Sequence, residues 1–229
     1  RANQIANLET TDLIALSTRQ LQAVSVSGIS ALRTDAIVAL TTKQVASLTA
    51  GQIGALTSTQ LGALESQDLK VLGVSSLSGL QLNYLSTSQI SDLLTTQVRA
   101  LLGSQISSLS TSNLNALTST QFQALTTTQV SSLKTQQISS IETADLQALN
   151  TTQIQAISRD SIGLLSTQAI NALSTDKLAA LNLVQFAALT TTQIASLGTT
   201  NLQALSTAQI GVLTAAQFNA LGSSQIGSL

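Results

Sequence analysis

The side chains best suited to chemistry are three pairs of carboxylates whose members lie three residues apart, namely Glu9 with Asp12, Glu65 with Asp68, and Glu142 with Asp145. Paired carboxylates can bind a hard cation or act as a general acid and base. No third oxygen ligand is fixed near these pairs, and no glycine-rich calcium loop accompanies them. Acidic side chains also interact favourably with the first turn of a helix, so we interpret the pairs as residues at helix starts.

The composition removes most other kinds of site. The 229 residues include no His, Cys, Met, Trp or Pro, and only 8% are charged. The chain therefore has no imidazole base, no thiolate nucleophile and no zinc site made of His or Cys. A net charge of −1 gives no basic surface for nucleic acid. We predict no enzyme activity, no catalytic, cofactor-binding or metal-binding residue, no cofactor, and no nucleic-acid partner.

The remaining distinctive side chains have structural interpretations. The cations are scattered along the chain, which is typical of a solvated surface: Arg19, Arg33, Lys43, Arg99, Lys134, Arg159 and Lys177. The three Phe residues, Phe122, Phe186 and Phe218, occupy one apolar series and are predicted to lie in the core. Tyr84 is the only Tyr, and its hydroxyl group is expected to bond backbone groups that a local irregularity sets free.

An eight-residue repeat positions all these residues. A series of Leu residues recurs at every eighth position, and a second apolar series of Ile, Leu, Val or Phe lies three residues before each of them. Lettered a to h, the repeat has Ser or Thr at a, Gln at d, an apolar residue at e, Ala or Ser at g, and Leu at h, as in Thr190 to Leu197 (TTTQIASL). We call each such repeat an octad.

The spacing within the octad favours a short helix. Positions e and h are three apart, which places them on one side of a helical turn but on opposite faces of a strand. Ser or Thr at a with Gln at d is the pattern of a capping box, in which each side chain bonds the backbone of the other residue. A continuous helix would carry the Leu series around its axis, because eight residues advance about 80° beyond two full turns. The sequence therefore predicts one short helix per octad.

Helices this short need neighbours, which predicts an all-α solenoid. Departures from Gln at d recur every thirty-two residues, at Asn113, Asp145 and Lys177, so we predict four octads per coil. Two coils of a two-helix hairpin would show the same period. A β-solenoid is the alternative architecture, since Thr is abundant and many β-helices have short repeats.

The repeats account for the whole chain. Octads occupy residues 1–80 and 86–229, and a five-residue insert at 81–85 shifts the phase between them. We therefore predict a single solenoid domain over residues 1–229. The chain begins at Arg1 without an initiator Met, which suggests a fragment or mature piece of a longer protein. It contains no signal peptide and no apolar run of transmembrane length.

The chain resembles known proteins at two levels. The string LTTTQI at 189–194 is similar to the LTxxQ signature that opens helices in bacterial periplasmic stress chaperones, which supports the capping interpretation. LTTKQV at 40–45 is similar to the opening of transcription-activator-like effector repeats, whose DNA reading this weakly charged chain cannot share. As a whole, the chain resembles short tandem arrays of very large secreted or surface-exposed bacterial proteins. That resemblance implies an extracellular or cell-surface location.

These observations lead to two functional hypotheses. The first is a structural protein, an extracellular stalk, spacer or filament subunit that associates end to end with itself or with flanking repeats. Open solenoid ends expose apolar surface, and little like charge opposes association. The second is an adhesin module that binds a polysaccharide or ice, because Thr recurs at position b.

Overall fold

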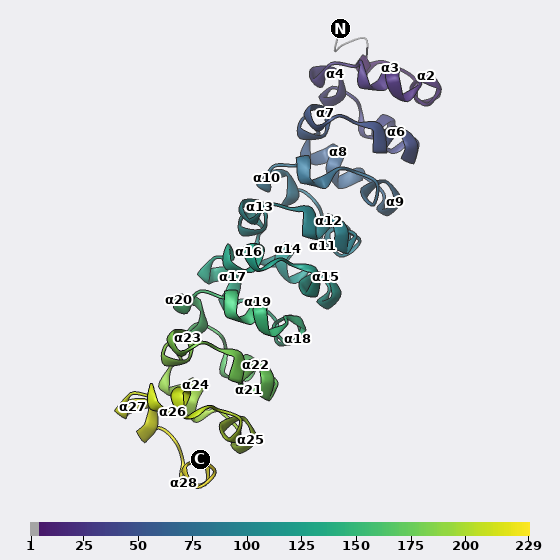
Figure 1. Ribbon diagram of the computed structural model, residues 1–229. Coiled ribbons are helices and arrows are strands. Elements are labelled where there is room, and N and C mark those ends of the chain that lie inside the picture. The colour runs from purple at the N-terminus through teal and green to yellow at the C-terminus, as the bar shows by residue number, and fades with distance from the viewer. Residues whose placement is uncertain (1–4) are drawn as a thin grey trace. The chain divides into compact units, whose positions relative to one another are not determined.

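The computed structural model describes residues 5–229 and contains only helices and their connections in that range. It divides into two compact units, the first ending at Leu117 and the second comprising Thr118–Leu229. Figure 1 shows that short helices follow one another without interruption in each unit. The predicted all-α solenoid of short helices is confirmed, and the β-solenoid alternative is wrong for the described residues.

The helices are four to six residues long, apart from one 3-10 turn, η1. In the first unit they are α2 (Thr10–Ala15), α3 (Thr18–Gln22), α4 (Val26–Ser30), α5 (Thr34–Val38), α6 (Thr42–Ser47), α7 (Ala50–Gly54), α8 (Ser58–Ala63), α9 (Ser66–Leu69), η1 (Val74–Ser76), α10 (Gly79–Leu82), α11 (Thr87–Ser91), α12 (Thr95–Ala100), α13 (Gly103–Ser108) and α14 (Thr111–Asn115).

In the second unit they are α15 (Ser119–Ala124), α16 (Thr127–Ser131), α17 (Thr135–Ser139), α18 (Thr143–Ala148), α19 (Thr151–Ala156), α20 (Arg159–Ile162), α21 (Thr167–Asn171), α22 (Thr175–Ala180), α23 (Leu183–Ala187), α24 (Thr191–Ala195), α25 (Thr199–Gln203), α26 (Thr207–Gly211), α27 (Ala215–Asn219) and α28 (Ser223–Ile226).

Position a is the N-cap residue of each octad helix, and in many octads its side chain caps the helix. Before α24, Thr190 is extended, with φ −75° and ψ 161°. The Gln193 backbone N–H donates to the Thr190 hydroxyl at 3.1 Å, and the Thr190 backbone N–H donates to Gln193 Oε1 at 2.7 Å. These two bonds satisfy amides that a helix start leaves without partners. The capping box predicted from the sequence is confirmed here.

The chain reverses between helices without left-handed residues. Within residues 5–229 no residue, glycine included, has a positive φ. The turn is made by the extended backbone at position a, preceded in several octads by an extended Leu at h, such as Leu125 with φ −58° and ψ 139°. Because extended backbone suits any residue, the octads need no glycine to change direction.

Positions e and h form the core. In the octad of α24, Ile194 is 0% exposed and Leu197 is 2% exposed. The same two positions are buried in almost every octad, and the exceptions lie near the ends of the described chain. Short helices thus gain their stability by adding one pair of apolar side chains each to a common core.

Each helix packs on the helix three octads further along. This spacing holds in the first unit for α3 with α6 and α5 with α8, and in the second for α15 with α18 and α16 with α19. The approach is close, since a Cβ atom on Gly163 would lie 2.9 Å from the Ala188 carbonyl oxygen of α23. Hydrogen bonds described below connect octads four apart, the spacing found in the sequence. One coil therefore comprises between three and four octads.

The phase-shifting insert lies earlier than predicted. Residues 78–85 form a regular octad whose helix, α10, has a complete capping box from Ser78 and Gln81. The shortened repeat is instead the five residues 73–77, which contain η1. Leu77 provides its h-type side chain and is 2% exposed, whereas Leu80, assigned by phase to the Leu series, is 64% exposed. The prediction of an insert at 81–85 is wrong because the eight-residue step alone could not show which Leu faces the core.

The five-residue repeat replaces a full octad in the packing. η1 contacts α7 three repeats before it and α12 three repeats after it, as an ordinary octad helix would. Its backbone is satisfied locally, because the Ser76 N–H donates to Gly73 O at 2.9 Å and the Leu77 N–H donates to Val74 O at 3.1 Å. One tight turn with one buried Leu is therefore sufficient to continue the solenoid.

Candidate functional site

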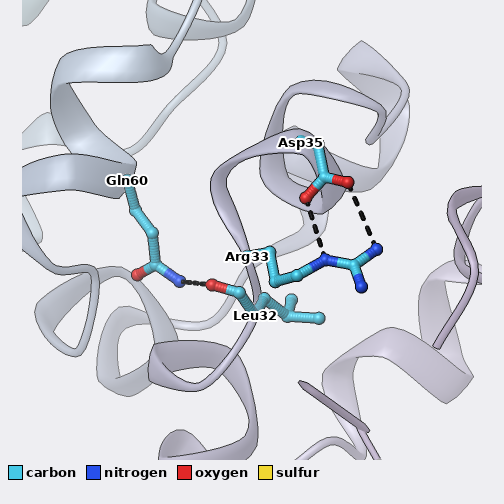
Figure 2. Close-up of polar contacts among 4 residues, drawn as sticks. All are labelled: Leu32, Arg33, Asp35 and Gln60. Carbon is cyan, nitrogen blue, oxygen red and sulfur yellow. Dashed lines mark hydrogen bonds and ion pairs between the residues drawn. The ribbon is translucent and has the colours of Figure 1, made fainter. Parts of the chain in front are cut away.

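The glutamine at position d joins two coils through its side-chain amide. Gln60 is 1% exposed and accepts from the Thr57 N–H through Oε1 at 2.9 Å. Its Nε2 group donates to Ile29 O at 2.9 Å and to Leu32 O at 2.7 Å, four octads earlier. Figure 2 shows the Gln60 side chain reaching the Leu32 carbonyl group. One amide thus caps its own helix and holds the carbonyl end of a helix in the preceding coil.

This contact repeats along both units. We define the glutamine ladder as the d-position glutamines whose Nε2 donates to the carbonyl oxygen of an h-position residue four repeats earlier. Its members include Gln44, Gln52, Gln60, Gln81, Gln89, Gln97 and Gln105 in the first unit, and Gln153, Gln185, Gln193, Gln209, Gln217 and Gln225 in the second.

The ladder also records the shortened repeat. Its members elsewhere bond an h-position carbonyl group 28 residues earlier, whereas Gln81, Gln89 and Gln97 bond one 25 residues earlier. Gln105 donates to Leu77 O at 2.6 Å, so the five-residue repeat supplies its own acceptor. The repeat at 73–77 is three residues shorter than an octad, but it still provides a carbonyl group to the glutamine ladder.

A second set of amides joins helices three octads apart. Side chains at position f donate to the carbonyl oxygen of position g in the next coil: Gln22 to Ser47, Gln147 to Ala172 and Gln155 to Ala180, at 2.7, 2.7 and 2.9 Å. The two sets bond opposite ends of each helix to different neighbours. In both sets, side-chain amide groups bind backbone carbonyl groups of the same chain.

Sequence reasoning found only half of this arrangement. It predicted that Gln at d accepts from the N-cap amide, but it assigned this side chain no contact outside its own octad. The structure buries most of these glutamines, for example Gln121 at 2% and Gln193 at 1% exposure. The frequent Gln at d could have indicated the contact between coils. A helix cap alone accepts several residue types, so a preference for one of them suggests a second role.

The three carboxylate pairs do not form three matching sites. Glu9, Glu65 and Glu142 are N-cap residues that make no side-chain capping bond. Asp12 is exposed, whereas Asp68 and Asp145 are 2% and 5% exposed. The interpretation as helix-start residues fits their positions but does not predict the burial of two of them.

Burial is the main cause of the raised pKa values of Asp68 and Asp145. It raises the pKa of the Asp145 carboxyl group to about 6; a hydrogen bond from the Ser119 hydroxyl, 3.3 Å from Oδ1, opposes this shift, and the Glu142 carboxylate adds to it. Burial also raises the pKa of Asp68, with a smaller contribution from Glu65. A carboxyl group removed from water favours its neutral form.

No group of three or more His, Cys, Asp or Glu side chains within residues 5–229 is arranged to hold a metal ion. Over the same range, no helix has both the length and the apolar character needed to cross a bilayer. These two findings leave the buried amides and aspartates as the most distinctive polar groups of the described chain.

Two of the cations have defined partners. Arg33 pairs with Asp35 at 3.1 Å on the surface, and this hydrogen bond lowers the pKa of Asp35 (Figure 2). Lys177 stands at position d and donates through Nζ to the Gln147 carbonyl oxygen. The surface interpretation suits Arg33 but is wrong for Lys177, which occupies the place of a ladder glutamine and bonds the preceding coil.

The aromatic residues follow the repeat with two exceptions. Phe122 and Phe186 are fully buried at position e, as predicted. Phe218, at position e of the octad of α27, is 39% exposed, so its predicted place in the core is wrong. Tyr84 lies at position g of a regular octad and is 38% exposed. Its predicted role at an irregularity is wrong, since the irregular repeat is residues 73–77 and Tyr84 lies outside it.

Comparison with known proteins agrees with the repeat architecture. The family model of the ALTTAQ repeat matches residues 5–42, 37–66, 138–175, 170–199 and 194–229, which together cover more than half of the chain. No curated protein matches the chain. The resemblance to short tandem-repeat arrays is confirmed by these five successive matches.

Proposed function

Because this chain belongs to the ALTTAQ repeat family, we propose that it serves as a stalk, spacer or filament subunit outside a bacterial cell. Repeat family and helical solenoid make it a structural repeat protein. The observation that carries the proposal is the glutamine ladder, because it assigns the most regular polar side chains to contacts between coils. A solenoid whose repeated glutamine contacts hold its own coils together is suited to spanning a distance.

Composition supports the extracellular location. The chain has no Cys and no Met, so it lacks the two side chains most readily oxidised outside the cell. Charged residues make up only 8% of the chain, which leaves a neutral surface of Ser, Thr and Gln. Fractionation of the source cells, with detection of the native protein, tests this part. Recovery in the cytoplasmic fraction alone would contradict it.

End-to-end association is the second part of the proposal. In the last coil Phe218, Ile226 and Leu229 are 39%, 44% and 50% exposed. A groove nearby is lined by Leu202, Leu205 and Ile210. Apolar surface of this kind favours contact with further repeats or with a second copy of the chain, and heterologous contacts can propagate into a filament.

Sedimentation at rising concentration tests association. We expect the average mass to increase with concentration, and we expect Phe218→Asp to weaken this increase. Val184→Asp is the matched control, because Val184 is also exposed, at 59%, but lies outside the last coil. A chain that stays monomeric near millimolar concentration would contradict self-association and leave the spacer role within a longer protein. Equal effects of both variants would place the contact elsewhere.

A ligand-binding adhesin is the alternative function, and one observation favours it. Helix capping uses the side chain at position a, and the neighbouring Thr at b is exposed, as at Thr127, Thr151 and Thr191. Free hydroxyl groups at a regular spacing could bind a polysaccharide or ice. Inhibition of ice recrystallisation and retention on polysaccharide columns test it. Loss of either activity on changing these Thr residues to Ala would favour the adhesin.

A further inference from the structure

Two octads place an aspartate where the ladder needs an amide. Asp68 and Asp145 both stand at position d and are 2% and 5% exposed. The Oδ1 atom of Asp68 is buried and has no hydrogen-bond partner within the described residues. A charged carboxylate in this place is costly, because it has lost water without gaining donors.

An asparagine in the same unit shows what a side chain of this length can reach. Asn113, also at position d, donates through Nδ2 to Leu82 O and Leu85 O, both at 3.2 Å. These acceptors lie 31 and 28 residues earlier, the offsets that Gln60 uses. The same offsets bring Asp68 opposite the carbonyl groups of Ile37 and Leu40. An O–H group can donate to such a carbonyl oxygen, whereas an ionised carboxylate can only repel it.

We propose that Asp68 and Asp145 are neutral carboxylic acids in the folded solenoid in mildly acidic solution, and that their ionisation as the pH rises loosens the coils, giving each unit one pH-sensitive octad. The acid O–H group of Asp68 takes the place of the glutamine N–H in the ladder. In Asp145, Oδ1 accepts from the Ser119 hydroxyl, and the other oxygen carries the proton. Loss of either proton leaves a buried negative charge without a cation beside it.

The residues packed around Asp145 and Asp68 place no cation beside either carboxyl group. α15 and α21, which pack on α18, carry no titratable residue. Glu142 on the same octad is negative, and Lys177 of α22 is bonded to Gln147 O, towards the other end of α18. Around Asp68, the packed helix α6 carries only Lys43, which is exposed. On its own octad Asp68 has Glu65 and the exposed Lys70, and only Glu65 affects its pKa.

The direction of the pH effect follows from the raised pKa. A carboxyl group whose pKa is higher in the folded chain than in the unfolded chain stabilises the fold at low pH, and the contribution is lost as the pH rises through the folded value. For Asp145 that value is about 6, against 3.8 for the free side chain. The ratio of folded to unfolded chain should therefore fall on the order of a hundredfold between pH 4 and pH 7 from this residue. The chain has no His or Cys to titrate in this window.

Denaturant unfolding at a series of pH values tests the proposal. The variant Asp68→Asn with Asp145→Asn replaces both acids by amides that cannot ionise. Asp12→Asn is the matched control, because Asp12 also stands at position d but is exposed. We expect the wild-type chain and the control to lose stability from pH 4 to pH 7, and the double variant to lose at least tenfold less in its folding ratio.

A direct titration completes the test and does not depend on the proposed function. The carboxyl carbons of Asp68 and Asp145 should titrate by NMR above the range of the exposed aspartates. Midpoints near 4 for both residues would overturn the proposal. So would a double variant whose stability falls with pH as steeply as that of the wild-type chain.

Discussion

The glutamine at position d uses both ends of its amide at once, which no other side chain of similar size can do as fully. In Gln60 the oxygen accepts from the backbone of its own helix start, while the nitrogen donates to two carbonyl groups of another coil. Glutamate could accept but not donate, and lysine can donate but not accept, as Lys177 does. This difference explains why Gln is the commonest residue at position d.

We predict that Gln60→Ala destabilises the first unit by about 2 to 4 kcal/mol, because it leaves buried backbone groups without partners. Gln67→Ala should cost less than about 0.5 kcal/mol, since Gln67 is exposed on the adjacent octad. Denaturant unfolding of the two variants measures the difference. Equal losses would show that the ladder bonds contribute little beyond surface polarity.

The N-cap residue sets where the helix of each octad begins, and the short length of the helix limits its internal hydrogen bonds. A helix of four to six residues makes few internal hydrogen bonds, so the two bonds of the capping box are a large share of its polar stabilisation. Neighbouring coils supply the remainder through positions e and h and through the ladder. This balance allows a single 3-10 turn, η1, to replace a full helix.

Removing a cap should therefore weaken a helix measurably. We expect Thr190→Ala to cost about 0.5 to 2 kcal/mol, because the Gln193 N–H would lose its acceptor. Thr191→Ala is a control at the next residue, which is exposed and lies inside α24. Thermal unfolding of both variants checks the prediction. A larger effect at Thr191 would contradict the capping assignment.

The position of the shortened repeat can be tested in the same manner. Leu77→Ala should destabilise the first unit by about 2 to 5 kcal/mol, as expected for a buried Leu, whereas Leu80→Ala should have little effect. The urea concentrations at the unfolding midpoints of the two variants separate the possibilities. If Leu80 proved the costly residue, the insert would lie at 81–85 after all.

The solenoid as a whole depends on contacts between successive coils. A coil in the middle of a unit receives ladder bonds from the coil after it, as Leu165 receives one from Gln193 at 2.7 Å. The last coil receives none in this sequence, since its acceptors would need glutamines beyond residue 229. Stability in such an array is the sum of the repeats and their neighbour contacts.

Hydrogen exchange should show this gradient within the second unit. The backbone amides of Leu165 and Leu221 make equivalent bonds, to Ile162 O and Phe218 O at 3.2 and 3.1 Å. We expect the Leu165 amide to exchange at least about tenfold more slowly, because opening it also breaks the ladder bond to the next coil. Equal rates for the two amides would indicate that the unit opens only as a whole.

The sequence alone determined the local structure. The spacing of e and h favours a helical turn, the Ser/Thr and Gln pair at a and d predicts a capping box, and the absence of His and Cys excludes the sites built from those side chains. These features depend on residues within eight positions of one another, so a single octad contains their cause. The burial of Phe122 and Phe186 follows in the same manner from their place in the e series.

The tertiary structure decided what lies between octads. Gln60 and Leu32 are 28 residues apart, and nothing local shows that the amide of one bonds the carbonyl group of the other. The same contact buries position d in most octads, which is why the Asp68 Oδ1 atom is buried without a hydrogen-bond partner. It also located the shortened repeat at 73–77, because Leu77 and Leu80 are alike in sequence and only packing can distinguish the one that faces the core.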